Sequence, residues 1–215
     1  MMEPTEENLR AWNELHRRRS AAFAAAPPLS PEALELLPEV AGKRVLHVFC
    51  GTGETSAELV ARGALVTGID LDEDALAAAR ERAPGGLFLV ADLHQLPSHL
   101  RRRKFELVYG GPGALAQVED VGAWVGAAAA ALRVRGELFL HERHPVAECL
   151  DPMNLRWRAD YFELPWRPGD LVAAVIDAGL VLSRLAELRP PASPRRRDPR
   201  VPSEFVLVAQ KPSGI

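Results

Sequence analysis

The feature that most constrains this chain is a glycine turn between two apolar segments, RVLHVFCGTGETSAELVARGALVTGID, at residues 44–70. The run at 45–49 has the length and composition of a buried strand, and a second such run follows a helix-like segment. Gly51 and Gly53 allow a tight turn and a close approach of a ligand to the backbone. Asp70 ends the second strand, where a carboxylate can bind two ribose hydroxyls. The unit predicts a nucleoside-cofactor site.

The same alternation of strand and helix continues along most of the chain. Further strands are expected at 87–91, 105–109, 137–141, 179–188 and 201–210. Helices are expected at 55–62, 72–82, 96–102, 118–132 and 169–178. Repeated strand–helix units predict an α/β fold, with a doubly wound, mostly parallel, seven-stranded sheet and helices on both faces. The last two strands have no helix between them, so they predict a C-terminal antiparallel hairpin.

The length of 215 residues suits one domain with small additions. Residues 1–40 are expected to form an N-terminal helical cap, with one helix at Asn8–Ala26 and a second beginning at Ser30. The stretch 145–168 interrupts the repeats and contains four aromatic residues. It is expected to be an insertion that lines a substrate pocket, although its aromatic side chains could equally fix it to the core. Proline and arginine predict an exposed loop at 189–200.

Composition narrows the function classes. The net charge of −3 argues against a dedicated nucleic-acid-binding protein. No apolar run approaches the ~20 residues of a membrane span, and the N-terminus lacks the order of a signal peptide, so a cytoplasmic protein is expected. Cys50 and Cys149 cannot build a disulfide framework. Nearly all basic side chains are arginine, a pattern reported for some thermophilic families, and no functional claim rests on it.

Three features bear on the identity of the cofactor. The turn Gly51-x-Gly53-x-x-Ser56 lacks the third glycine of a strict dinucleotide fingerprint. Asp70 suits the ribose of either NAD or S-adenosylmethionine. Asp92, at the end of the third strand, can accept a hydrogen bond from an adenine amino group. Together with the terminal hairpin, which differs from the usual dehydrogenase sheet, Asp92 favours S-adenosylmethionine.

At this point the sequence resembles a known family, the class I, Rossmann-like S-adenosylmethionine-dependent methyltransferases, over about residues 8–212. The segments VFCGTG, VTGIDLDEDAL, VADLHQLP, FELVYGGPGAL and LRVRGELFLHERHP follow the family's order. More narrowly, LHVFCGTGETSAELVARGA and ERHPVAECLD are similar to a bacterial branch with a Leu-His strand start and Glu-x-His-Pro after the fifth strand.

The resemblance implies a role for each matching residue. Asp70 would bind the ribose hydroxyls, and Asp92 the adenine amino group. The adenine ring would lie between Leu71 and Leu93. The methionine part of S-adenosylmethionine, or of the product S-adenosylhomocysteine, would lie along the glycine turn and the end of the fourth strand. The residues implied there are Cys50, Gly51, Gly53, Tyr109 and Gly110.

The chain departs from the family pattern at two positions. Most members carry an acid where this chain has His47, and a glycine where it has Phe49. The acid usually orders the ammonium group of the cofactor, so its absence bears on cofactor affinity. The phenylalanine can be accommodated if its ring points into the core.

Residues after the fifth strand are candidates for catalysis. Methyl transfer is an in-line displacement, so the protein mainly positions donor and acceptor, and a base can help to deprotonate the acceptor. His144 is the expected base or acceptor-orienting group, with Glu142 on the same side of the strand and His141 on the other. The alternative is that His144 is a turn residue before Pro145. The spacing of HERH fits no metal site, so no metal is expected.

The expected function is S-adenosylmethionine-dependent methyl transfer to an unidentified small molecule. The fourth strand ends in YGGPGA rather than the Asn/Asp-Pro-Pro-aromatic loop of enzymes that methylate nucleic-acid amino groups. Two other functions stay open, namely an NAD(P)-binding oxidoreductase and a non-catalytic S-adenosylmethionine-binding protein. A small-molecule partner, no membrane and no nucleic acid are expected, with the protein a monomer or a homodimer.

Overall fold

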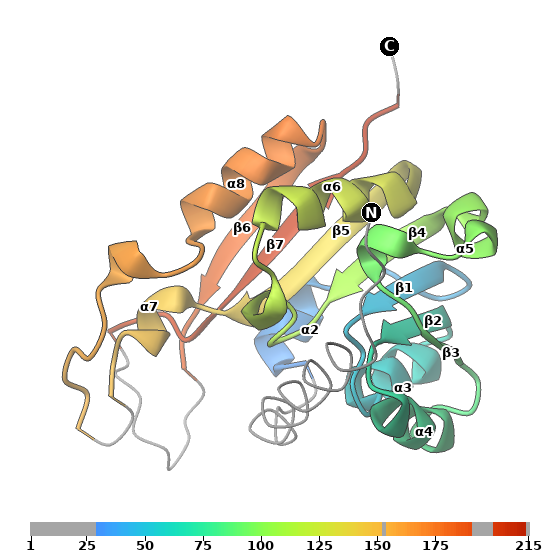
Figure 1. The fold of residues 1–215 in the computed structure, drawn as a ribbon, viewed down its shortest axis with the longest axis horizontal. Coiled ribbons are helices and arrows are strands. Elements are labelled where there is room, and N and C mark those ends of the chain that lie inside the picture. Colours follow the sequence, from blue (N-terminus) through green and yellow to red (C-terminus); the bar gives the residue numbers. More distant parts are fainter. Residues whose placement is uncertain (1–28, 152–153, 191–199, 214–215) are drawn as a thin grey trace, which may run out of the picture.

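A seven-stranded sheet forms the centre of the computed structural model, which describes residues 29–151, 154–190 and 200–213 (Figure 1). The strand order is β3-β2-β1-β4-β5-β7-β6. The strands are β1 Arg44–Val48, β2 Leu65–Asp70, β3 Leu87–Val90, β4 Phe105–Gly110, β5 Leu132–Arg143, β6 Val181–Leu188 and β7 Glu204–Gln210. Strands β1 to β5 pair in parallel, whereas β7 is antiparallel to both β5 and β6. The predicted mixed sheet with a C-terminal antiparallel pair is confirmed.

Helices cover both faces of this sheet (Figure 1). One face carries α2 Pro31–Leu36, α3 Glu54–Ala61 and α4 Glu73–Arg82. The other carries α5 Ser98–Arg103, α6 Val121–Ala131 and α8 Pro168–Asp177. The short helix α7 Pro145–Glu148 follows β5 directly. The helix predicted at Asn8–Ala26 and residues 191–199 of the predicted exposed loop lie outside the described residues.

Each face has its own apolar core, because strand side chains alternate between the two faces. On the side of α6 and α8, Trp124, Leu138 and Leu171 are among the fully buried side chains. On the side of α2 and α3, Tyr109 and Phe139 stack with ring centroids 5.8 Å apart. Burial on both faces explains why the parallel strands read as continuous apolar runs in the sequence.

The strand order places the glycine turn at a site that suits ligand binding. Strands β2 and β4 lie on opposite sides of β1, so the direction of winding reverses at β1. In open parallel sheets, ligands bind at the carboxyl edge next to such a reversal. The turn that follows β1 therefore opens onto this edge.

Among the boundaries that differ from the sequence-based expectation are those of β1, β5 and β7. Strand β1 ends at Val48, and Phe49 adopts a left-handed φ of 52° outside the strand. The glycine that the resemblance implies at this position would adopt this φ without strain. The phenylalanine ring packs against the core on the α6 side. Strand β5 begins at Leu132 rather than at 137, with an irregularity in its pairing to β4. Strand β7 begins at Glu204, after Pro202, which cannot donate a strand hydrogen bond.

A close contact between the turn and α4 requires glycine at position 53. Gly53 has a φ of 82°, and a Cβ atom there would lie 2.8 Å from Ala79 Cβ and 2.9 Å from Ala79 Cα. Both the backbone angle and the space exclude a larger residue. The start of α3 can therefore pack directly against α4.

We expect Gly53→Ala to lower the free energy of unfolding by about 2–4 kcal/mol, because it combines left-handed strain with overpacking. Urea unfolding is the measurement, and Gly126→Ala is the matched control. Gly126 lies within α6 with open space around it, so the control should be stabilised by roughly 0.5–1 kcal/mol. Equal effects of the two substitutions would contradict the packing argument.

His47 is a neutral core residue in the centre of β1. Its side chain is 3% exposed, its Nδ1 lies 2.8 Å from Ser56 Oγ, and its ring packs edge-on against Tyr109 at 4.9 Å. Burial lowers the pKa of His47 to about 3. The position where the resemblance implies an acid is therefore uncharged at neutral pH.

A neutral buried histidine makes stability depend on pH in a defined direction. The unfolded chain binds a proton at His47 below about pH 6.5, whereas the folded chain does not, so stability falls as the pH falls towards 3. Between pH 7.5 and pH 5, we expect this residue alone to remove about 2 kcal/mol. Urea unfolding of wild type and His47→Gln at both pH values measures the difference, and identical pH dependence in the two proteins would refute it.

Candidate functional site

Asp70 is held by backbone donors at the start of the candidate site. Its Oδ2 accepts the Gly51 N–H at 2.8 Å, and its Oδ1 accepts those of Leu71 at 2.7 Å and Asp72 at 3.1 Å. An ionised carboxylate can accept about four hydrogen bonds, so Asp70 retains capacity for a ligand. These bonds fix the carboxylate beside the glycine turn.

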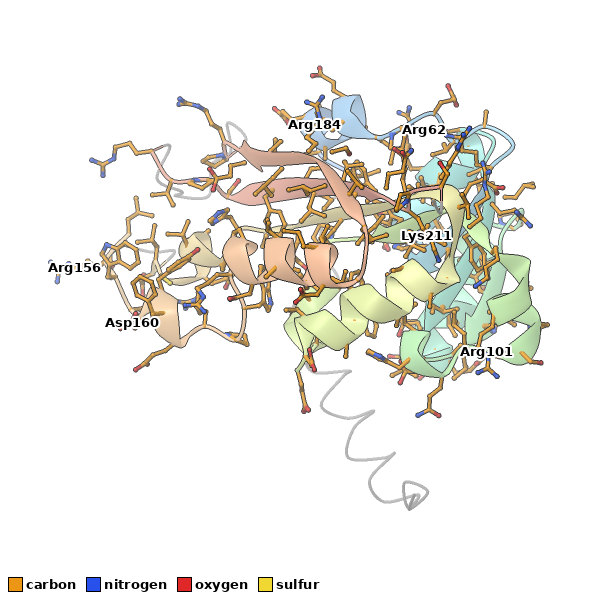
Figure 2. The ribbon with its side chains drawn as sticks, turned by 90° about the horizontal axis from the view of Figure 1, so that it is seen from above. Arg62, Arg101, Arg156, Asp160, Arg184 and Lys211 are labelled. Carbon is orange, nitrogen blue, oxygen red and sulfur yellow. The ribbon has the colours of Figure 1, made fainter. Side chains whose placement is uncertain are left out.

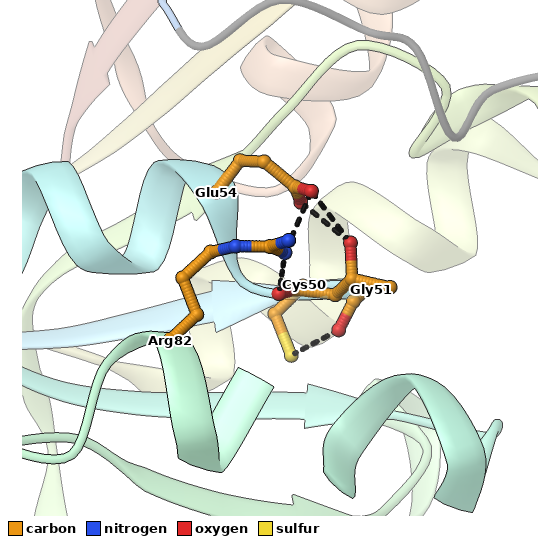
Figure 3. Close-up of polar contacts among 5 residues, drawn as sticks. Cys50, Gly51, Glu54 and Arg82 are labelled. Atoms are coloured by element: carbon orange, nitrogen blue, oxygen red, sulfur yellow. Dashed lines mark hydrogen bonds and ion pairs between the residues drawn. The ribbon is translucent and has the colours of Figure 1, made fainter. Parts of the chain in front are cut away.

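Arg82 and Glu54 brace the turn from outside (Figure 3). The Arg82 guanidinium, from α4, donates to the Thr52 carbonyl and pairs with Glu54 Oε1 at 2.7 Å. The Thr52 hydroxyl donates to Glu54, also at 2.7 Å, and the Cys50 thiol donates to the Gly51 carbonyl at 3.9 Å. Sequence reasoning missed this brace, because Arg82 is distant in sequence and carries no motif signal.

Asp92 follows β3, next to the end of β2. Its Oδ1 accepts the His94 N–H at 2.9 Å, and within the described ranges no partner is found for its other oxygen. The Asp70 carbonyl accepts the Ala91 N–H at 3.1 Å, which keeps the two strand ends together. The structure therefore brings together the two predicted carboxylates. Of the predicted adenine neighbours, Leu71 is half-buried and Leu93 is packed into the core.

Tyr109 and Gly110 end β4 beside β1. Tyr109 pairs with His47, and Gly110 with Val48. Burial raises the pKa of Tyr109, so its phenol is neutral. Its hydroxyl is buried close to the Thr55 side chain and lies 3.5 Å from the Cβ position of Gly111.

Glu142 ties that loop to the end of β5. Its Oε1 accepts the N–H groups of Gly113 and Arg143, both at 2.7 Å, and its Oε2 accepts the Leu115 N–H at 3.0 Å. The side chain is buried, and burial raises the pKa of Glu142 against the lowering effect of these N–H groups. Oε2 has one partner among the described residues and can accept another hydrogen bond.

His144 does not join Glu142. Its Nε2 lies 2.9 Å from Glu187 Oε1 on β6, and its Nδ1 accepts the Val146 N–H at 3.2 Å as the cap of α7. Burial lowers the pKa of His144, although Glu187 opposes this effect. Both ring nitrogens are engaged, which favours the alternative that His144 is a structural turn residue. His141 lies on the opposite face of β5, with Nε2 3.0 Å from Glu204 Oε2.

A cavity of about 170 Å³ lies next to Glu142. Its wall includes Gly113 of the loop after β4, and Pro145, Leu164, Pro165 and Trp166 from the segment predicted to be an insertion. Of the four aromatic residues in that segment, Trp166 lines the cavity, whereas Trp157 and Phe162 are exposed. Arg156 and Asp160 in the same segment project from one end of the molecule (Figure 2).

No helix in the described ranges is both long and apolar enough to span a membrane. Nor do those ranges bring three histidine, cysteine or acidic side chains together in a way that could hold a metal ion.

Comparison with known proteins gives partial matches in sequence. Residues 45–136 match the model of a methyltransferase domain family. Over 78 residues the chain is 40% identical to the ubiquinone biosynthesis O-methyltransferase of Aromatoleum aromaticum, covering 34% of this chain and 33% of that protein. The corresponding enzyme of Pseudomonas putida strain GB-1 is 42% identical over 83 residues, 37% of this chain and 31% of that protein. The chain thus spans about a third or less of the curated relatives it matches.

Comparison of structures extends over most of the chain. An S-adenosylmethionine-dependent methyltransferase from Mesorhizobium loti superimposes with a TM-score of 0.69 at 25% identity, covering 84% of this chain and 96% of that one. A TehB-like methyltransferase from Corynebacterium glutamicum shares the fold, with a TM-score of 0.61 at 20% identity over 94% of this chain and 99% of that one. These matches show that residues 45–136 resemble a methyltransferase domain and that the chain has the Rossmann-like fold of S-adenosylmethionine-dependent methyltransferases.

Proposed function

We propose that this protein binds S-adenosylmethionine along the carboxyl edge of β1 to β4 and transfers its methyl group to a small molecule. The observation that carries this proposal is the pair of carboxylates, Asp70 and Asp92, at neighbouring strand ends beside the glycine turn. Both retain acceptor capacity after their contacts with the backbone. A ribose diol and an adenine amino group, which are hydrogen-bond donors, are the matching ligand groups.

The residues at this edge fit the cofactor in three further respects. The backbone of Cys50, Gly51 and Gly53 can be approached closely, because the two glycines carry no side chain. Tyr109 is fully buried beneath Gly111, so its ring supports the strand end where the methionine part would lie. Leu71 offers an apolar contact for the adenine ring.

S-adenosylmethionine supplies a methyl group on a positively charged sulfur, which leaves as a neutral thioether. The protein needs to align the acceptor with that methyl group and to remove a proton from it. Asp70 and Asp92 hold the nucleoside end, and the loop that Glu142 anchors after β4 adjoins the reacting end. The chain therefore contributes to methyl transfer mainly by positioning the donor and the acceptor.

The cavity beside Glu142 is the proposed acceptor pocket. It lies against the loop that follows Gly110, and five of its wall residues come from the 145–168 segment, namely Pro145, Glu148, Leu164, Pro165 and Trp166. This supports the interpretation of that segment as an insertion that forms the pocket. The sequence relatives named O-methyltransferases support a hydroxyl group as the acceptor.

Glu142 is the proposed base, in preference to His144. Glu142 lines the cavity and keeps an acceptor position on Oε2, and burial raises its pKa. A base with a raised pKa removes a proton more effectively. His144 has no unengaged nitrogen and is not part of the cavity wall.

Calorimetric titration with S-adenosylmethionine, S-adenosylhomocysteine and NADH tests the proposal. We expect micromolar binding of the first two and none of NADH. Asp70→Ala should weaken binding by about 10- to 100-fold, and Asp92→Ala by about 10-fold, because hydrogen bonds to a charged group contribute about 1.5–3 kcal/mol each. Glu81→Ala, an exposed acid on α4, is the control for net charge and should bind like wild type.

Two results would contradict this proposal in different ways. Binding of NADH instead of S-adenosylmethionine would support the oxidoreductase alternative. Tight binding of S-adenosylmethionine without turnover for any acceptor would indicate a non-catalytic binding protein. The neutral His47, which replaces an acid, is the feature that raises this alternative.

A further inference from the structure

We propose that the cavity beside Glu142 accepts a single aromatic ring that carries a hydroxyl group, so that the methyl acceptor is a phenol. This inference rests on the proposed function and extends it to the acceptor class and the attacking atom. Three properties of the cavity support it: its size, its wall and its one buried carboxylate.

The size of the cavity fits one ring. Its volume is about 170 Å³. An apolar protein cavity of about 150 Å³ binds benzene. The volume of the cavity therefore suits a single ring such as phenol.

The wall of the cavity favours an uncharged, flat ligand. Pro145, Leu164, Pro165 and Trp166 present apolar surface, and the indole of Trp166 is held by an edge-on contact with Phe205 at 6.0 Å. A fixed aromatic side chain stacks on a second ring more favourably than on an aliphatic chain. Two charged side chains of the wall pair with each other, with Arg143 Nη1 3.8 Å from Glu148 Oε1. Neither therefore needs a charged ligand as its partner.

Glu142 is a buried carboxylate residue in the wall of this mainly apolar space. Three backbone N–H groups hold it in place, and Oε2 accepts only the Leu115 N–H among the described residues. A ligand hydroxyl can donate to the remaining acceptor position. In an apolar surrounding such a bond is stronger than in water.

The chemistry of transfer favours a phenol over an amine or an aliphatic alcohol. A carboxylate keeps an amine protonated, and a protonated amine has no lone pair for attack. Phenols ionise near pH 10, whereas aliphatic alcohols are far weaker acids, so a phenol transfers its proton to a raised-pKa carboxylate with the smaller penalty.

The proposed step is balanced within the site. The phenol proton moves to Glu142 Oε2 as the phenol oxygen forms its bond to the methyl carbon. The bond between that carbon and sulfur breaks, and its electron pair stays on sulfur. The products are an aryl methyl ether, a neutral thioether and protonated Glu142, which returns its proton to solvent.

The first experiment measures occupancy of the cavity without turnover. Saturation-transfer NMR follows phenol, cyclohexanol and benzylamine on the apo protein and on its complex with S-adenosylhomocysteine. We expect phenol to bind at least 10-fold more tightly than the other two. Leu164→Trp, which fills the cavity, should abolish phenol binding without changing the affinity for S-adenosylhomocysteine. Phe162→Trp, at an exposed position in the same segment, should bind phenol like wild type.

The second experiment follows the reaction with S-adenosylmethionine, with anisole from phenol detected by mass spectrometry. Glu142→Gln should lower the rate by about 100-fold or more while phenol binding is retained. Pentafluorophenol is already ionised at neutral pH and needs no base, so its methylation should be nearly equal in wild type and Glu142→Gln. His144→Asn should leave both rates within a few-fold of wild type.

The outcomes separate this inference from the proposed function. Failure to bind S-adenosylmethionine would overturn the proposed function, even if phenol occupies the cavity. Binding of S-adenosylmethionine with a preference for benzylamine or cyclohexanol, or with phenol binding unaffected by Leu164→Trp, would overturn the acceptor class alone. Equal losses with phenol and pentafluorophenol in Glu142→Gln would show that Glu142 only supports the loop.

Discussion

The hydrogen bond from the Gly51 N–H to Asp70 couples the glycine turn to the end of the neighbouring strand. Parallel pairing of β1 with β2 brings both to one edge of the sheet, and Gly53 lets α4 pack against the turn without a side chain between them. The Arg82–Glu54 pair then closes the outer side of the turn. A short segment with little apolar surface is thereby fixed from three directions, which is the preorganisation that a ligand site needs.

Charge is unevenly distributed along this edge. Asp70 and Asp92 lie at the ends of β2 and β3, whereas the buried His47 in β1, paired with Ser56, is neutral. In the proposed complex, a cationic ammonium group would meet dipoles there rather than a carboxylate. Glu142, near the end of β5, holds the loop after β4 and lines the cavity.

Much of this arrangement is readable from the sequence, and the exceptions have physical causes. Apolar strands, proline and glycine punctuation, and the acids after β2 and β3 are local signals, so the sheet, Asp70 and Asp92 could be predicted. The roles of Glu142 and His144 depend on which distant groups reach them, such as the Gly113 N–H and the Glu187 carboxylate, and no local pattern encodes those contacts. The Arg82 brace was missed for the same reason. The left-handed Phe49 could be anticipated only from the glycine that it replaces.

The most direct test of the central claim is a crystal structure of the protein with S-adenosylhomocysteine. We expect the ribose hydroxyls to donate hydrogen bonds to Asp70 and the adenine amino group to donate one to Asp92. The sulfur should be directed towards the cavity beside Glu142. A ligand bound away from Asp70 and Asp92, or with its sulfur turned away from that cavity, would contradict the assignment of this edge as the methyl-transfer site.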